Sequence, residues 1–153
     1  MHHTRDVAGL AAALVELISF LNSPRRDDLL LDEAGVELDR ALFPLLVRLG
    51  MAGPLSVAGL ADQVGRDHTT ISRQLAKLEG LGLILRQDGA DDRRVRSARL
   101  TPAGEAVVQA ISGARRRLLS RALAEWSETD LADLARLNRR FVDALAEAGR
   151  DRG

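Results

Sequence analysis

Residues 56–101 contain two short amphipathic segments joined by a glycine turn, and this arrangement restricts the fold more than any other part of the sequence. Ser56 is a suitable N-cap for a first helix through Val64, because its hydroxyl can accept a hydrogen bond from a free backbone N–H. Gly65 permits a sharp turn, after which a second helix is expected over residues 68–80. This spacing predicts a helix-turn-helix.

A basic hairpin follows the two helices. Residues 83–86 and 96–100 have the composition of short strands, and residues 87–95 are expected to form the loop between them. Two helices followed directly by such a hairpin predict a winged helix-turn-helix. The expected fold class is therefore mainly α with a small β-hairpin wing.

The regions on either side of this segment have helical periodicity. Further helices are predicted over residues 6–21, 37–50, 102–123 and 128–148. Pro44 lies inside the second of them, so we expect a kink there or a later start. Residues 24–35 are polar and acidic apart from three leucines, and we expect them to form a loop or a short turn of helix.

The composition is that of a soluble globular protein, with 46% hydrophobic and 29% charged residues in a chain of 153. This length suits one domain with a substantial core. The absence of cysteine excludes disulfides, thiolate nucleophiles and cysteine-ligated zinc. We expect a cytoplasmic location and no membrane partner, because residues 1–6 lack a signal-peptide pattern and no apolar run has the length of a membrane span.

Charge is distributed unevenly although the net charge is zero. Residues 65–101 hold eight basic and five acidic side chains, a net charge of +3. Residues 1–64 carry −4 and residues 102–153 carry +1. Because attraction to phosphate depends on a local basic face, this distribution is compatible with nucleic-acid binding by the central segment.

The second helix of the helix-turn-helix has one apolar stripe, formed by Ile71, Leu75 and Leu78. The side chains left facing outward are His68, Thr69, Thr70, Arg73, Gln74 and Lys77. The N-terminal part of such a helix meets base edges in a DNA major groove, where arginine can bind guanine through two hydrogen bonds. The alternative is an ordinary solvated helix face.

The hairpin is rich in arginine. Its arginines are Arg86, Arg93, Arg94, Arg96 and Arg99. Arginine is favoured in a narrow, electronegative minor groove, so we expect the hairpin tip to contact DNA. Asp92 is expected to pair with a neighbouring arginine and hold the loop in shape. The alternative is a charged, solvated hairpin tip.

Several motifs in this region resemble the MarR family of bacterial winged-helix regulators. They are Leu60-Ala61, Thr70-Ile71-Ser72-Arg73-Gln74-Leu75 with Leu78-Glu79, Gly82-Leu83-Ile84-Leu85-Arg86, Asp92-Arg93-Arg94 and Leu100-Thr101-Pro102-Ala103-Gly104. The Asp-Arg-Arg motif followed at a fixed distance by Leu-Thr-x-x-Gly is the most specific of these. The motifs cover about a third of the chain.

The resemblance implies a homodimer that binds a pseudo-palindromic operator in double-stranded DNA, often to repress nearby genes. It implies one domain over residues 1–153, with a DNA-binding part over 37–101 and dimerisation helices over 6–21 and 102–148. It assigns Thr69, Thr70 and Arg73 to the major groove, Arg94 with Arg93 to the minor groove, and Asp92 to the support of the wing. Arg66 and His68 depart from the residues common at their positions, so the family's base preference does not transfer.

The first and last helices carry long apolar stripes, which a partner's helices would cover in a homodimer. Packing within their own domain is the alternative.

Many relatives release DNA when a small molecule binds between the dimerisation region and the winged domain. Phe20, Phe43 and Trp126 could line such a pocket, but aromatic residues at helical spacing are more often core. A solvated helix face is favoured over an anion site for residues 115–117.

An enzymatic function finds little support. The three histidines, His2, His3 and His68, have no catalytic motif around them, and no metal or cofactor is expected. Gly80-Leu81-Gly82 is a fragment of a dinucleotide motif that follows a helix instead of a strand. The remaining alternative is a winged helix that serves as a protein-interaction scaffold without DNA binding.

Overall fold

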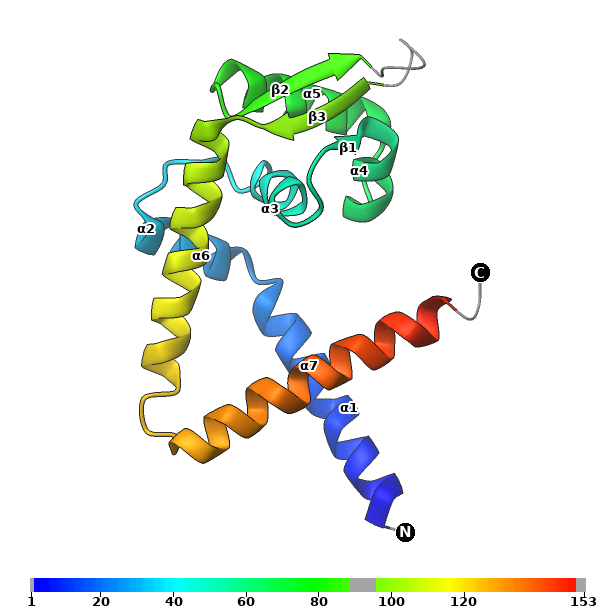
Figure 1. The fold of residues 1–153 in the computed structure, drawn as a ribbon, viewed down its shortest axis with the longest axis vertical. Helices are drawn as coiled ribbons and strands as arrows, with labels where there is room; N and C mark the ends of the chain where they lie inside the picture. The colour runs from blue at the N-terminus through cyan, green and yellow to red at the C-terminus, as the bar shows by residue number, and fades with distance from the viewer. Residues whose placement is uncertain (1, 89–95, 151–153) are drawn as a thin grey trace. The chain divides into compact units, whose positions relative to one another are not determined.

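Seven helices and a small sheet make up the part of the chain that the computed structural model describes, residues 2–88 and 96–150 (Figure 1). In chain order the elements are α1 His2–Leu21, α2 Pro24–Ala34, α3 Phe43–Ala52, β1 Leu55–Ser56, α4 Val57–Val64, α5 His68–Gly80, β2 Ile84–Asp88, β3 Arg96–Leu100, α6 Pro102–Ala122 and α7 Glu128–Arg150. The chain divides into two units, Met1–Arg115 and Arg116–Gly153. The mainly helical fold class with a small wing sheet is confirmed.

The sheet has the strand order β1-β3-β2, and both pairs are antiparallel. Ile84 lies opposite Leu100, and Asp88 lies opposite Arg96, so β2 and β3 form the predicted hairpin. β2 begins one residue later and ends two residues later than expected. Strand β1 was not predicted, because its two residues have no periodicity and are defined only by their pairing with β3.

The core of the first unit lies between α3, α4, α5 and the sheet, which Figure 1 shows grouped together. Its largest fully buried side chains are Leu45, Leu46, Leu49, Leu60, Ile71, Leu75, Leu78 and Ile84. Each of the three helices contributes one apolar stripe to this core, as amphipathic helices do in globular domains. The core therefore fixes the orientation of α5, whose other face is left outside.

Local capping explains why α4 and α5 begin and end where the sequence predicts. The Ser56 hydroxyl accepts a hydrogen bond from the Gly59 N–H at 3.0 Å, at the start of α4. Gly65 has a φ of 70°, a left-handed conformation that costs glycine little. Asp67 then caps α5 by accepting a hydrogen bond from the Thr70 N–H at 2.8 Å.

Helix α2 corrects the expectation of a loop or short turn over residues 24–35. It is a regular helix of 11 residues. Pro24 stands in its first turn, where its fixed φ favours a helix and its missing N–H costs nothing. Gly35, with a φ of 66°, ends the helix by donating its N–H to the Asp32 carbonyl, and Leu31 is buried. The polar composition reflects one exposed face of a helix.

Helix α3 begins at Phe43, so the later start is the correct one of the two alternatives for Pro44. Pro44 lies in the first turn, where no backbone hydrogen bond is lost. The segment before it forms a turn in which Asp39 accepts a hydrogen bond from the Ala41 N–H at 2.9 Å.

Thr101 joins the end of the hairpin to the start of α6. Its hydroxyl donates to the Gly82 carbonyl at 2.6 Å and accepts from the Gly104 N–H at 3.1 Å. The Thr101 N–H also donates to the carbonyl of Leu83 at 3.0 Å. The Leu-Thr-x-x-Gly motif therefore fixes the first turn of α6 against the beginning of β2.

In the second unit, α7 begins after Ser127, whose hydroxyl accepts a hydrogen bond from the Asp130 N–H at 3.1 Å. The start of this helix is as predicted, and it runs two residues further than expected. None of the described helices is by itself long and apolar enough to cross a membrane. Only the bent pair His3–Leu21 and Pro24–Ala34, taken together, has the necessary length and apolar composition.

Candidate nucleic-acid interface

The predicted recognition helix is α5, and its burial follows the predicted pattern. Ile71, Leu75 and Leu78 are fully buried, which holds one face of the helix against the core. On the other side, the exposed candidate residues are His68, Thr69, Arg73 and Lys77. This face offers one donor-acceptor hydroxyl and two long cationic side chains, together with an imidazole at the helix start.

Thr70 is only partly exposed, and its hydrogen bonds are largely internal. Its hydroxyl donates to Asp67 Oδ2 and its backbone N–H donates to Asp67 Oδ1, both at 2.8 Å. These two bonds, the backbone bond above all, hold the pKa of the Asp67 carboxyl below its ordinary value. Since its hydroxyl proton is engaged, Thr70 can offer DNA its methyl group and an acceptor oxygen.

Gln74 is half-buried, and its carbonyl oxygen is already bonded. Arg66 Nη1 donates to Gln74 Oε1 at 2.8 Å and to the backbone carbonyl of Ala41 at 2.8 Å. In the sequence, Arg66 was notable only because it differs from the residues common at its position. The structure places it as a link between the helix-turn-helix turn, α5 and the segment before α3.

Two further residues of the same helix are exposed. Ser72 and Ala76 lie three and seven residues after Thr69 and are exposed. Helical spacing places them beside Thr69 and Arg73 on the surface of α5. Their exposure follows from helical spacing in the sequence alone.

In the wing, the structure describes the two strands but not the tip. Asp92, Arg93 and Arg94 lie outside the described residues. At the end of the strands that adjoins the tip, Arg96 Nε lies 3.6 Å from Asp88 Oδ1, and both side chains are exposed. This pair joins two residues that face each other across the strands, and because both side chains are exposed it is a weak, solvent-screened ion pair.

A second ion pair attaches the wing to the recognition helix. Arg86 Nη2 lies 3.3 Å from Glu79 Oε1, and the Arg86 backbone N–H donates to Glu79 Oε2 at 3.2 Å. Glu79 belongs to α5 and Arg86 to β2. The two elements expected to contact DNA are therefore joined by side-chain and backbone bonds as well as by the core.

Comparison with known proteins agrees with this arrangement. A model of the MarR family matches residues 38–95, which run from the segment before α3 into the wing. The HTH-type transcriptional regulator YxaD of Bacillus subtilis (strain 168) is 34% identical over 110 residues, which cover 69% of this chain and 77% of that protein. The chain belongs to the MarR family. It is a transcriptional regulator with a DNA-binding winged helix, and members of this family are not enzymes.

Solved structures of other proteins share the fold. A MarR family protein from Bacillus stearothermophilus has a TM-score of 0.77 at 22% identity, over 94% of this chain and 97% of the other. A probable transcriptional regulator from Pseudomonas aeruginosa is 30% identical, with a TM-score of 0.58 over 83% of this chain and 96% of the other. These likenesses extend over the flanking helices as well as the winged helix.

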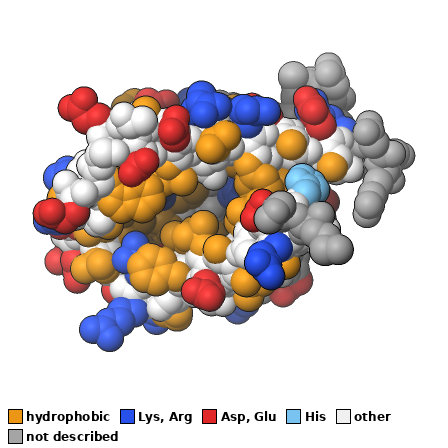
Figure 2. Space-filling view, turned by 90° about the horizontal axis from the view of Figure 1, so that it is seen from below, with side chains coloured by type: hydrophobic (Ala, Val, Ile, Leu, Met, Phe, Trp, Pro, Cys, Tyr) orange, Lys and Arg blue, Asp and Glu red, His pale blue; other side chains and the backbone are white. Residues whose placement is uncertain are grey.

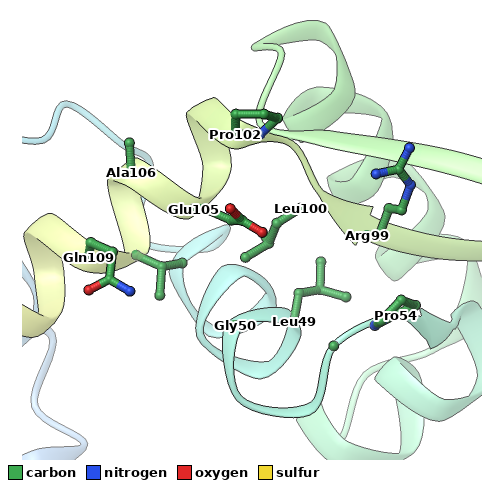
Figure 3. Close-up of a pocket in the computed structure, with 11 residues that line it drawn as sticks. Leu49, Gly50, Pro54, Arg99, Leu100, Pro102, Glu105, Ala106 and Gln109 are labelled. Carbon is green, nitrogen blue, oxygen red and sulfur yellow. The ribbon is translucent and has the colours of Figure 1, made fainter.

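An open cavity of about 740 Å³ lies in the winged-helix unit of this MarR-family chain, between the end of α3, β3 and the start of α6 (Figure 3). Leu49 and Leu100 provide apolar lining, Arg99 comes from β3, and Glu105 and Gln109 come from α6. Its walls thus carry one cationic and one anionic side chain.

None of the three aromatic residues considered from the sequence lines this cavity. Phe20 instead lines a separate groove with α2, where the Arg26 guanidinium lies 3.9 Å from the centre of the Phe20 ring. Among the described residues, no group of three or more histidine, aspartate or glutamate side chains could hold a metal ion.

Helices α1 and α7 each carry several exposed large apolar side chains, and large hydrophobic side chains reach the surface in the space-filling view (Figure 2). On α1 they are Val7, Leu10, Val15, Leu17, Ile18, Phe20 and Leu21. On α7 they are Leu131, Leu134, Leu137, Val142 and Leu145. Each of these side chains is at least 42% exposed, far more than a core residue.

Proposed function

We propose that this regulator is a homodimeric repressor that binds a pseudo-palindromic DNA operator through one α5 and one wing of each copy, and that a small molecule releases it. The observation that carries the DNA-binding part is the division of α5 into a fully buried face and a face with exposed His68, Thr69, Arg73 and Lys77. A helix held in this way can enter a major groove without losing its own packing.

Within α5, the contacts are assigned by position and chemistry. Thr69 and Arg73 contact base edges, because they lie one turn apart at the centre of the exposed face. Thr70 contributes its methyl group or acceptor oxygen at the edge of this surface. Lys77 lies further toward the C-terminus and contacts a phosphate, and His68 contacts the backbone or a base at the helix start.

In the wing, Arg94 enters the minor groove with Arg93 in support, and Asp92 holds the tip in shape, as the family resemblance implies. Arg96 contributes less, because it pairs with Asp88 where the strands adjoin the tip. The division of the chain follows these roles: residues 37–101 bind DNA, whereas 6–21 and 102–148 carry the dimerisation helices.

Dimerisation is supported by the uncovered apolar faces of α1 and α7. Isolated chains rarely expose contiguous apolar surface on this scale, and two copies can cover it by packing these helices together. Two protomers related by a two-fold axis would present two copies of α5, which matches a pseudo-palindromic operator.

The cavity between α3, β3 and α6 is the proposed site of the effector. It is bounded by the strand that leads out of the wing and by the helix that continues the chain toward α7. A ligand with apolar surface and an anionic group would contact the leucines and Arg99. Because β3 and α6 meet at Thr101, a shift of one element there moves the other.

Selection of duplexes from a random DNA library by the full-length protein tests this function. We expect an enriched motif with two related half-sites, bound at physiological salt well above non-specific DNA. If no duplex competes above non-specific binding, sequence-specific regulation is wrong for this chain and the scaffold alternative is favoured.

A further inference from the structure

The corner between the recognition helix and the wing is short. Only residues 81–83 separate α5 from β2, and the two elements lie side by side (Figure 1). Gly82, with a φ of 74°, turns the chain, and its N–H donates to the Glu79 carbonyl at 2.9 Å. The Leu83 N–H donates to the Leu78 carbonyl at 3.0 Å. The backbone of this turn is thus bonded to the last turn of α5.

Glu79 also bonds beyond the turn, to the edge of the wing. Its Oε2 accepts the Arg86 backbone N–H at 3.2 Å, and its Oε1 lies 3.3 Å from Arg86 Nη2. Because β2 is an edge strand with β3 on its other side, this carboxylate takes the place of a neighbouring strand. In the described part of the chain, Glu79 is the one α5 side chain with a hydrogen bond or ion pair to β2.

A small change of angle at this corner becomes a large displacement further along the wing. From Leu83 to Asp88 the chain covers about 17 Å at the usual rise of a strand, so a tilt of about 10° at Leu83 moves Asp88 by about 3 Å. Successive nucleotides along one DNA strand are separated by about 3.4 Å along the helix axis, so this displacement is close to one base-pair step. The ion pair itself contributes little to stability, because the Arg86 and Glu79 side chains are 20% and 40% exposed.

We propose that Glu79 is a positioning residue for DNA recognition. Its bond to the Arg86 N–H sets the distance along the operator between the base pairs that α5 reads and those that the wing contacts. The proposal rests on the proposed function, in which the α5 and the wing of one copy contact the same half-site. Without this bond, the hairpin keeps its strand pairing and the burial of Ile84, but its angle to α5 is less strictly fixed. The wing then contacts DNA at more than one distance from α5.

Two operators of different spacing test this role with the full-length protein. The first is the motif that the wild type selects from a random library. Methylation interference at guanine N7 and adenine N3 distinguishes its major-groove positions from its minor-groove positions. The second operator has one base pair inserted between these two sets of positions in each half-site. The measured quantity is the ratio of the two affinities for each protein.

We expect the wild type to bind the second operator about tenfold more weakly, because the wing no longer meets its positions. For Glu79→Ala the ratio should fall to about twofold, because the wing can follow the displaced positions. Glu79→Gln is the matched control, since its amide oxygen still accepts the Arg86 N–H although the charge is gone, and it should keep the wild-type ratio. Glu79→Leu is a second variant without an acceptor and should behave as Glu79→Ala does.

Circular dichroism and urea unfolding verify that each variant is folded. A residue with a merely structural role would weaken binding to both operators equally, so a wild-type ratio in folded Glu79→Ala or Glu79→Leu would overturn the proposal. The proposal is also wrong if the wild type tolerates the insertion, or if Glu79→Gln loses the ratio as fully as Glu79→Ala. If the wild type selects no operator at all, the proposed function fails, and this proposal falls with it.

Discussion

Gly104 lies so close to Leu83 that a Cβ atom added to Gly104 would overlap the Leu83 carbonyl oxygen. The same carbonyl accepts the Thr101 N–H, so Leu83, which directly precedes β2, cannot move away without losing this bond. This contact explains the glycine of the Leu-Thr-x-x-Gly motif. It holds the first turn of α6 against the start of the wing.

Replacement of Gly104 by alanine should destabilise the winged-helix unit. The added methyl group meets backbone rather than a flexible side chain, so relief requires the start of α6 to move, at a cost of about 1–3 kcal/mol. Urea unfolding measures the change. Gly80→Ala is the control, because nothing lies within 4 Å of its added Cβ. Equal stability of Gly104→Ala and the wild type would show that the contact is not rigid.

Thr70→Val should raise the pKa of Asp67 toward its ordinary value, because the substitution removes the hydroxyl bond and leaves the backbone bond in place. A carboxyl with a lowered folded-state pKa adds stability above its unfolded pKa and loses it as pH falls through the folded value. The stability difference between Thr70→Val and the wild type should therefore shrink below about pH 4.

NMR titration of the Asp67 carboxyl measures this pKa directly. Thr69→Val is the matched control, since Thr69 is exposed and is not among the groups that lower the pKa of Asp67. An unchanged Asp67 pKa in Thr70→Val would contradict the assignment of the hydroxyl as a donor.

An acidic residue in the apolar stripe of α7 should break the homodimer. Leu134→Asp and Leu145→Asp each place a charge where the partner's helices are expected to pack, and an unpaired buried charge is strongly unfavourable. Sedimentation equilibrium should show a monomer or an unfolded chain. Ala132→Asp adds the same charge on the polar side of α7 and should leave a dimer. A stable wild-type monomer at micromolar concentration would disprove dimerisation.

Lys77→Ala should weaken DNA binding by a similar factor for all sequences, because a phosphate contact does not discriminate between bases. The slope of log affinity against log salt should fall by about 0.9 for each lost phosphate contact in each half-site. Fluorescence anisotropy at several salt concentrations measures this slope. A loss of affinity confined to the selected motif would instead assign Lys77 to base recognition.

The parts of the fold that could be predicted are those with local causes. The bounds of α5 follow from Gly65, the Asp67 cap and the periodicity of three buried residues. By contrast, β1 exists only through its pairing with a strand some 40 residues later. Helix α2 is indicated by the proline in its first turn and the glycine at its end, whereas its polar composition alone is typical of a loop.

The same division applies to the site. The outward face of α5 could be predicted because helical spacing alone separates it from the core. The bond from Arg66 to Gln74 depends on a third partner, Ala41, that only tertiary packing brings near. The sequence therefore identified Gln74 as polar and outward, but the orientation of its amide needed the structure.

The central claim is that the exposed face of α5 reads the operator, and Arg73 lies at the centre of that face. We expect Arg73→Ala to lose about five- to 150-fold in affinity for the selected operator relative to non-specific DNA, the range for loss of one paired arginine contact. Arg48→Ala, an exposed arginine on α3, should bind as the wild type does. Retention of both wild-type affinity and wild-type base preference by folded Arg73→Ala would contradict the claim.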